Sequence, residues 1–122
     1  MKLADIFKQG VAPAPMPAVT PYIPRIIWQT TKDRFQIAAP LLQCVNTLKS
    51  MNPDWEHRLF DDETQYTFLS NVCTDRFMRA YNRIEPKYGA ARADIFRYVA
   101  VYLHGGIYLD MKSGTKRPLD QI

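Results

Sequence analysis

The sequence predicts an α/β fold with a mostly parallel sheet, and three observations support this prediction. Short apolar segments typical of strands alternate with longer segments of helical spacing. The chain has 122 residues, 47% of them hydrophobic, which is enough for the core of one domain and too little for two. No internal repeat interrupts the alternation. Strands that alternate with helices form a parallel sheet covered by helices, and a doubly wound arrangement is the leading case.

Three segments have the composition of strands. Residues 26–28 are two isoleucines and a tryptophan that follow Pro24, which favours a short buried strand. Residues 55–60 alternate apolar and polar side chains, as a half-buried strand does. Residues 107–109 are apolar and follow two glycines, so they predict a third strand.

Four longer segments between these strands have helical spacing. Residues 38–51 carry Pro40 in a first turn, and the acids of residues 61–63 supply the cap and first turn of a helix that runs towards residue 73. A third helix begins near residue 74 and ends before Pro86, and a fourth covers residues 88–104 and ends at Gly105. We expect one apolar face of the last helix to pack on the sheet. That face comprises Ala91, Ile95, Tyr98, Val99 and Tyr102.

The N-terminal 22 residues differ from the rest of the chain. Residues 2–9 predict a short amphipathic helix, and residues 10–24 contain five prolines, which favour an extended arm. We therefore divide the chain into an N-terminal helix and Pro-rich arm, residues 1–22, and a folded domain, residues 23–122.

Composition narrows the possible partners and the compartment. The net charge is +4 and the pI is near 9.2, but the basic residues are scattered and form no patch with interleaved aromatics, which argues against nucleic acid. No apolar run is long enough for a membrane span, and no signal pattern begins the chain. Cys44 and Cys73 are expected as buried free thiols, with one disulfide as the alternative. We expect a cytoplasmic protein, with peripheral membrane association as a further candidate.

Charged residues that could form a site concentrate in the last third of the chain. Asp94 and Arg97 are three positions apart on the predicted last helix, and Asp110 follows the last strand, where ligands bind in open α/β sheets. The alternatives from spacing alone are a solvent-exposed ion pair and a turn-capping aspartate. The chain has no Gly-rich dinucleotide fingerprint and no phosphate loop, so neither device would hold a nucleotide.

Four sequence blocks in one order carry a resemblance to a known family. They are residues 23–30, 52–62, 91–98 and 105–110. In this order they resemble the glycosyltransferases with a DxD sugar-binding region, family 32, which includes yeast-type initiating α-1,6-mannosyltransferases and bacterial capsule and viral enzymes. The resemblance runs from about residue 23 to residue 119. It implies a GT-A fold and transfer of a sugar from a nucleotide diphosphate donor to a hydroxyl of a saccharide or other acceptor.

The same resemblance implies roles for individual residues. Trp28 and Gln29 would line the nucleoside pocket, Asp94 and Arg97 would contact the donor sugar and nucleotide, and Asp110 would be the first aspartate of the DxD motif. Tyr108 belongs to the same donor-binding set. Where the family has His-Gln-x-Trp, this chain has Trp28 at the His position and Thr31 at the Trp position, so Trp28 would supply the aromatic face for the base.

The second aspartate of the motif is replaced by Lys112. The family implies Mn²⁺ or Mg²⁺, held here by Asp110, but an ammonium group cannot ligate a metal ion. It can neutralise a leaving diphosphate, so we predict weak or absent metal dependence with Lys112 as the substitute cation. The alternatives are an inactive site and a solvent-directed lysine with the metal held elsewhere.

The family pattern is cut off after the DxD strand, since only residues 111–122 follow it. We therefore expect the nucleotide-binding half of a GT-A enzyme, whose exposed sheet edge favours a homo-oligomer. The alternative function is a catalytically inactive half-domain that acts as a nucleotide-binding or protein-interaction module.

Overall fold

A computed structural model describes residues 2–13, 15, 23–85 and 87–121, and its centre is a three-stranded parallel sheet. The strands are β1 (Ile26–Thr30), β2 (Glu56–Phe60) and β3 (Ile107–Tyr108), in the order β2-β1-β3. Trp28 of the central strand pairs with Arg58 on one side and with Tyr108 on the other. The predicted α/β class with a parallel sheet is confirmed, and it is compatible with a GT-A-like half.

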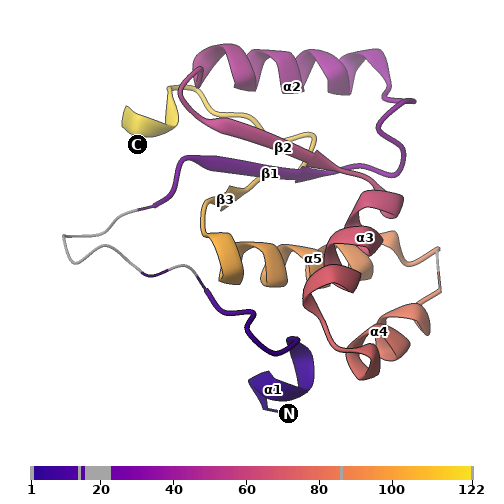
Figure 1. Ribbon diagram of the computed structural model, residues 1–122. Helices are drawn as coiled ribbons and strands as arrows, with labels where there is room; N and C mark the ends of the chain where they lie inside the picture. Colours follow the sequence, from indigo (N-terminus) through magenta and orange to yellow (C-terminus); the bar gives the residue numbers. More distant parts are fainter. Residues whose placement is uncertain (1, 14, 16–22, 86, 122) are drawn as a thin grey trace.

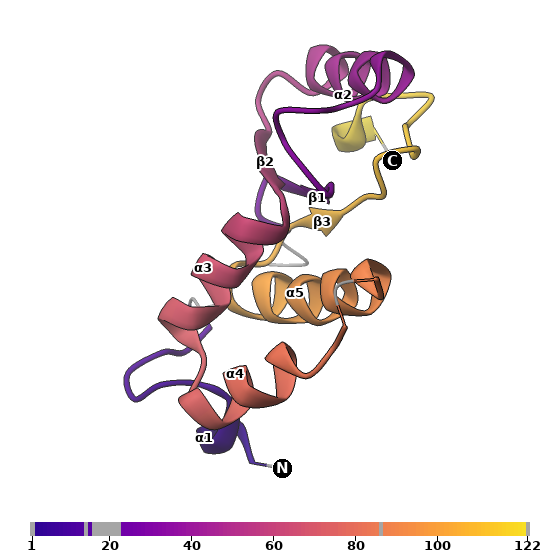
Figure 2. The same cartoon turned by 90° about the vertical axis from the view of Figure 1, so that its right-hand side faces the viewer.

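Helices cover both faces of the sheet (Figure 1). One face carries α2 (Ala39–Met51) and a C-terminal 3₁₀ turn (Leu119–Gln121). The other face carries α5 (Gly89–His104), beside α3 (Asp62–Val72), with α4 (Asp75–Asn82) farther from the sheet. α3 follows the carboxyl end of β2, whereas α5 leads into the amino end of β3, and the two helices lie side by side (Figure 2). Each predicted strand and helix is present, with ends that differ by a few residues.

An aromatic cluster forms the core between the sheet and α5. Trp28 is fully buried, and its ring lies 6.0 Å from Phe96 on α5 and 6.2 Å from Phe68 on α3. Phe60 at the end of β2 lies 4.8 Å from Phe96 between ring centroids. Offset and edge-to-face contacts of this kind are favourable beyond the buried area alone. The cluster fixes the distance between the strand ends and α5.

The face of α5 that packs on the sheet differs from the predicted one. The buried residues are Phe96, Val99, Ala100 and Leu103, whereas Tyr98 is 69% exposed and Tyr102 is 44% exposed. The predicted residues and the buried residues both recur at helical spacing, since apolar side chains are spread widely around this helix. The sequence pattern could not choose between them; contact with the aromatic cluster determines the choice.

Two glycines connect α5 to β3. Gly106 has φ 99°, a left-handed conformation, and a Cβ there would lie 2.6 Å from the carbonyl oxygen of Ile26. Gly105 ends α5, and its carbonyl accepts a 2.8 Å hydrogen bond from Nε1 of Trp28. The paired glycine thus allows β3 to approach β1 closely and anchors the core tryptophan.

The N-terminal segment packs on the domain. The helix α1 (Leu3–Ile6) is shorter than predicted, and Phe7 stacks on Tyr102 with ring centroids 5.5 Å apart. Most of the Pro-rich arm, residues 14 and 16–22, lies outside the described residues. Cys44 and Cys73 are free thiols, but only Cys73 is buried; the expectation that Cys44 is buried is wrong, because it lies on the exposed face of α2. None of the helices described here combines the length and the apolar character of a membrane span.

Candidate functional site

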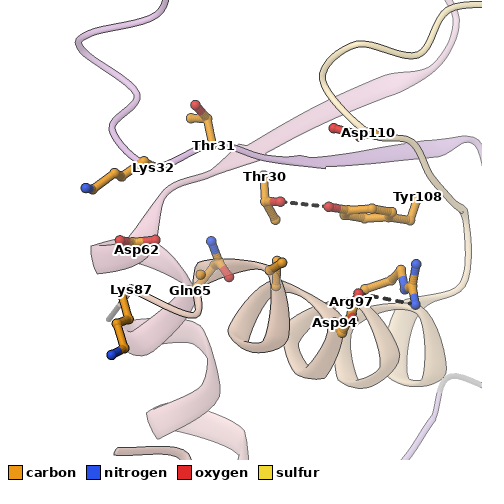
Figure 3. A pocket seen from close by; sticks show the side chains of 13 residues that line it. Thr30, Thr31, Lys32, Asp62, Gln65, Lys87, Asp94, Arg97, Tyr108 and Asp110 are labelled. Atoms are coloured by element: carbon orange, nitrogen blue, oxygen red, sulfur yellow. Dashed lines mark hydrogen bonds and ion pairs between the residues drawn. The ribbon is translucent and has the colours of Figure 1, made fainter. Parts of the chain in front are cut away.

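A cavity of about 500 Å³ lies where the carboxyl ends of β1 and β3 meet the N-terminal ends of α3 and α5 (Figure 3). The chain passes from β1 to β2 on one side and then returns across the sheet to β3 on the other side of β1. The direction in which strands are added therefore reverses next to β1. Ligands of open α/β sheets bind at such a point, beyond the carboxyl ends of the strands. The cavity lining includes Thr30, Thr31, Lys32, Asp62, Gln65, Lys87, Asp94, Arg97, Tyr108 and Asp110.

One end of the cavity combines an acid, a base and a tyrosine. Nη2 of Arg97 lies 3.4 Å from Oδ1 of Asp94, and its guanidinium lies 5.5 Å from the centroid of the Tyr108 ring. The Tyr108 hydroxyl forms a 2.7 Å hydrogen bond with Oγ1 of Thr30, which joins β3 to β1. The Asp94 side chain is 62% exposed and that of Arg97 is 36% exposed, so both remain available to a ligand. Ala90 and Ala93 line the cavity beside them, and their small side chains leave room there.

Asp110 borders the same cavity from the end of β3. Two hydrogen bonds to residues of β1 fix the backbone of this segment. The amide of Leu109 donates to the carbonyl of Trp28 at 3.0 Å, and the Gln29 side chain donates to the carbonyl of Asp110 at 3.2 Å. The Asp110 carboxylate itself is exposed. The structure therefore brings together four of the predicted site residues, Asp94, Arg97, Tyr108 and Asp110.

Gln29 lies behind the cavity rather than in its wall. It is fully buried, its Oε1 lies 2.7 Å from Nε2 of His57, and its Nε2 donates to Asp110. Since the Gln29 amide nitrogen is the donor to Asp110, its oxygen accepts from His57, which assigns the proton to Nε2 of the imidazole. Burial lowers the pKa of His57, and Lys49 lowers it further, so the ring is neutral at pH 7. The prediction that Gln29 lines the nucleoside pocket is wrong; it supports Asp110 from within the protein.

Replacing Gln29 with methionine should lower the free energy of unfolding by about 2 kcal/mol, because the part-buried carbonyl of Asp110 and the half-buried His57 ring would each lose a partner. Chemical denaturation measures the change. Gln43→Met, at an exposed position of α2, is the matched control and should change stability little. Equal stability of the two variants would contradict the role given to Gln29.

Trp28 does not reach the cavity either. Its indole is 0% exposed and is enclosed by the aromatic cluster, so it has no free face for a nucleobase. The prediction of stacking on Trp28 is therefore wrong. The physical reason is strand alternation: Trp28 points towards α5, where the core requires a large apolar side chain.

Lys112 lies in a different cavity, between α2 and the C-terminal segment, together with Pro40, Thr47 and Thr115. The amide of Ser113 donates to the carbonyl of Asp110 at 2.9 Å, so the chain turns immediately after Asp110. In an extended segment, positions 110 and 112 would share a face; the turn ends that alternation. Lys112 is therefore not placed to bind the donor or to replace the metal beside Asp110.

The described residues do not form a metal centre of their own. Within them, no group of three or more His, Cys, Asp or Glu side chains is arranged to hold a metal ion. Asp110 would supply a single carboxylate, whereas Mg²⁺ and Mn²⁺ take several oxygen ligands.

Several cavity residues were not anticipated from the sequence. Lys32 follows β1, Asp62 and Gln65 lie in the first turns of α3, and Lys87 precedes α5. Lys87, between α4 and α5, and Gln65, within α3, carry no such sequence signal, whereas Lys32 and Asp62 share the signal that identified Asp110, polar residues just beyond the carboxyl end of a strand. It applies to β1 and β2 as well as to β3.

Asp61 connects the loop after β1, which contains Lys32, to the start of α3. The Asp61 carboxylate caps α3 by accepting from the amide of Thr64 at 3.0 Å, and it accepts from Nε of Arg34 at 3.1 Å. Burial alone would raise the pKa of Asp61, but these hydrogen bonds from Thr64 and Arg34 outweigh it and lower the pKa to about 2. The ionised carboxylate thus stabilises the fold at neutral pH.

Acid should weaken this anchor. The Asp61 pKa is lower in the folded state than its ordinary value of 3.8, so its contribution is complete above about pH 4 and disappears as the pH falls through about 2. We expect a loss of about 2 kcal/mol in the free energy of unfolding over this interval. Denaturant titrations at several pH values measure it, and Asp61→Asn, which cannot titrate, should show a smaller slope. An unchanged slope in that variant would exclude Asp61 as the source.

Comparisons with known proteins identify the family of this chain. Residues 40–122 match the family model described as "Glycosyltransferase sugar-binding region containing DXD motif". The chain is 35% identical over 102 residues to inositol phosphoceramide mannosyltransferase 3 of Schizosaccharomyces pombe, covering 82% of this chain and 27% of that protein. It is 32% identical over 108 residues to the initiation-specific alpha-1,6-mannosyltransferase of Candida albicans, covering 80% of this chain and 26% of that protein.

A third relative, inositol phosphoceramide mannosyltransferase 1 of Schizosaccharomyces pombe, is 30% identical over the whole of this chain and 37% of its own length. No solved structure matches the chain significantly. The chain thus spans between a quarter and two fifths of these longer relatives. The resemblance carried by the four sequence blocks is confirmed: this chain belongs to the glycosyltransferase family whose sugar-binding region contains the DXD motif.

Proposed function

We propose that this chain is the donor-binding part of an enzyme that transfers a hexose from a nucleotide diphosphate sugar to a hydroxyl acceptor. The observation that supports this most is the cavity in which Asp94, Arg97, Tyr108 and Asp110 meet at the carboxyl ends of β1 and β3. Mannose is the first sugar to test, because the relatives are named as mannosyltransferases. Inositol phosphoceramide, which appears in two of those names, is the first acceptor to test.

The side chains have distinct tasks in this proposal. The Arg97 guanidinium, placed over the Tyr108 ring, offers planar donors to the diphosphate. The carboxylates of Asp94 and Asp110 accept hydrogen bonds from hydroxyls of the sugar or ribose. Asp94 also holds Arg97 in position through their 3.4 Å ion pair.

A thermal-shift panel of UDP- and GDP-linked hexoses, mannose among them, tests the proposal. A donor that binds the folded chain should raise its melting temperature, because binding stabilises the folded state by an amount that grows with the logarithm of the donor concentration, about 3 kcal/mol at a hundredfold excess over Kd. A chain that responds to no nucleotide sugar but forms a stable oligomer at micromolar concentration would instead be the inactive interaction module.

Metal dependence should be weak. Because Asp110 is the single carboxylate at the motif, a divalent cation would find few protein ligands there, and adding EDTA should change the affinity for the donor by less than about threefold. The measurement is a donor titration with Mn²⁺ and with EDTA. Binding that disappears in EDTA would contradict this prediction and would leave the rest of the proposal intact.

A further inference from the structure

Asp110 lies beyond the regular pairing of the sheet, and a side chain of the neighbouring strand holds it there. The strand β3 ends at Tyr108, two residues before Asp110. The carbonyl of Asp110 accepts a 3.2 Å hydrogen bond from the Gln29 side chain of β1 and a 2.9 Å hydrogen bond from the amide of Ser113 in its own turn. The Gln29 amide is therefore the group of the sheet that fixes the position of Asp110.

A second side chain, His57 of β2, determines how the Gln29 amide is oriented. The carbonyl of Asp110 can only accept, so the amide nitrogen of Gln29 faces it and Oε1 faces the other way. This Oε1 lies 2.7 Å from Nε2 of His57, which donates to it. Gln29 is 0% exposed, so bulk water does not compete for its amide.

The three residues form one hydrogen-bonded series across the whole sheet. His57 lies on β2, Gln29 on the central strand β1 and Asp110 after β3, which is the spatial order of the three strands (Figure 1). The series lies on the face of the sheet opposite to Trp28, because adjacent residues of a strand point to opposite faces. It ends at the edge of the cavity, directly behind the Asp110 carboxylate.

The series depends on the position of one proton. The His57 ring is neutral at pH 7, because burial and the charge of Lys49 both lower its pKa, and a neutral ring carries a single N–H. The Gln29 oxygen holds that proton on Nε2. A proton on Nδ1 would leave two acceptors facing each other, His57 Nε2 and Gln29 Oε1.

Loss of the His57 donor would reach the cavity through Gln29. The buried Oε1 would be unpaired, and the amide could find a new donor for it only by turning, which would break the bond to Asp110. Hydrogen bonds from a ligand to a carboxylate are directional, and a displacement of about 1 Å is enough to weaken them strongly. The geometry of Asp110 in the cavity thus depends on a residue of β2.

We propose that His57 is a positioning residue of the donor site: through the buried amide of Gln29, it holds the Asp110 carboxylate where it binds hydroxyls of a nucleotide sugar. The inference rests on the proposed function. It gives a role in donor binding to a residue that does not itself line the cavity.

Two variants of nearly equal shape test this role. His57→Gln keeps an N–H donor at about the reach of the imidazole Nε2, whereas His57→Met has the same length and no donor. Calorimetric titration with GDP-mannose, or with a UDP-linked hexose where that binds more tightly, measures the affinity. His57→Met should bind about tenfold more weakly than His57→Gln, which should stay within about threefold of the wild-type chain. Equal affinities of the two variants would overturn the inference.

Inorganic pyrophosphate separates positioning of Asp110 from a general loosening of the fold. Under the proposed function the diphosphate is bound by Arg97 on α5, which the series does not contact. Both His57 variants should therefore bind pyrophosphate as tightly as the wild-type chain does. If His57→Met lost affinity for pyrophosphate and for the nucleotide sugar equally, His57 would be structural only and the inference would be wrong.

The tautomer of His57 tests the series in the wild-type chain, and it carries the test if His57→Met does not fold. Correlation of the imidazole ¹⁵N and ¹H resonances at pH 7 should place the proton on Nε2; a proton on Nδ1 would overturn the inference. If the wild-type chain binds a nucleotide sugar and the two variants bind it alike, the inference alone fails. If the wild-type chain binds no nucleotide sugar, the proposed function fails and the inference fails with it.

Discussion

Trp28→Ala is expected to lower the free energy of unfolding by about 4 kcal/mol, the largest stability effect of any single substitution that we predict. The indole is fully buried among Phe60, Phe68 and Phe96, so its removal leaves a large cavity in the aromatic cluster. It also removes the 2.8 Å hydrogen bond to the carbonyl of Gly105, leaving that group with one partner fewer. Since small domains are stable by about 5–15 kcal/mol, the variant should be largely unfolded on moderate heating.

The second tryptophan provides the control. Trp55 follows α2, and its Nε1 donates to Asp120 at 3.3 Å on an exposed surface. Trp55→Ala should therefore change stability by about 1 kcal/mol or less. Chemical denaturation of the two variants compares them directly. A Trp28→Ala protein as stable as Trp55→Ala would mean that the aromatic cluster does not hold the sheet and α5 together.

For Trp28, the sequence predicts the strand correctly but not the direction of the side chain. The strand of residues 26–28 was predicted from its apolar, β-branched composition, and its central position in the sheet agrees with that composition. The family motif places Trp28 in this strand but does not specify on which side of the sheet its side chain lies. Strand alternation directs Trp28 to the core and Gln29 to the opposite side, so both residues affect the site only from behind.

The cavity itself was predictable only in part. Asp94, Arg97 and Asp110 follow from the rule that ligands bind beyond the carboxyl ends of strands, together with the order of the sequence blocks. Lys112 does not, because the turn after Asp110 depends on a local hydrogen bond that a motif cannot reveal. Gln65 does not follow from the rule either, because its place in the cavity wall depends on how α3 packs beside the sheet, which is a property of the folded chain.

Asp110→Ala and Asp94→Ala are each expected to abolish the thermal shift produced by a nucleotide sugar. Each removes a carboxylate that borders the cavity, and a lost hydrogen bond to a charged group weakens binding by about 1.5–3 kcal/mol, or roughly tenfold to a hundredfold. At donor concentrations near Kd for the wild-type chain, a loss of this size leaves the site nearly empty. The melting temperature without donor should change little, because both side chains are exposed.

Three further variants test whether the loss of the thermal shift comes from the carboxylates in the cavity. Asp54→Ala, at an exposed position before β2, removes the same charge far from the cavity and should retain the full shift. Asp110→Asn keeps the shape of the side chain, so its loss of the shift would attribute binding to the carboxylate rather than to packing. Arg97→Ala should also lose the shift, since the guanidinium would face the diphosphate. A wild-type response that persists in both aspartate variants would mean that the donor binds outside this cavity, and the proposed roles of Asp94 and Asp110 would then be wrong.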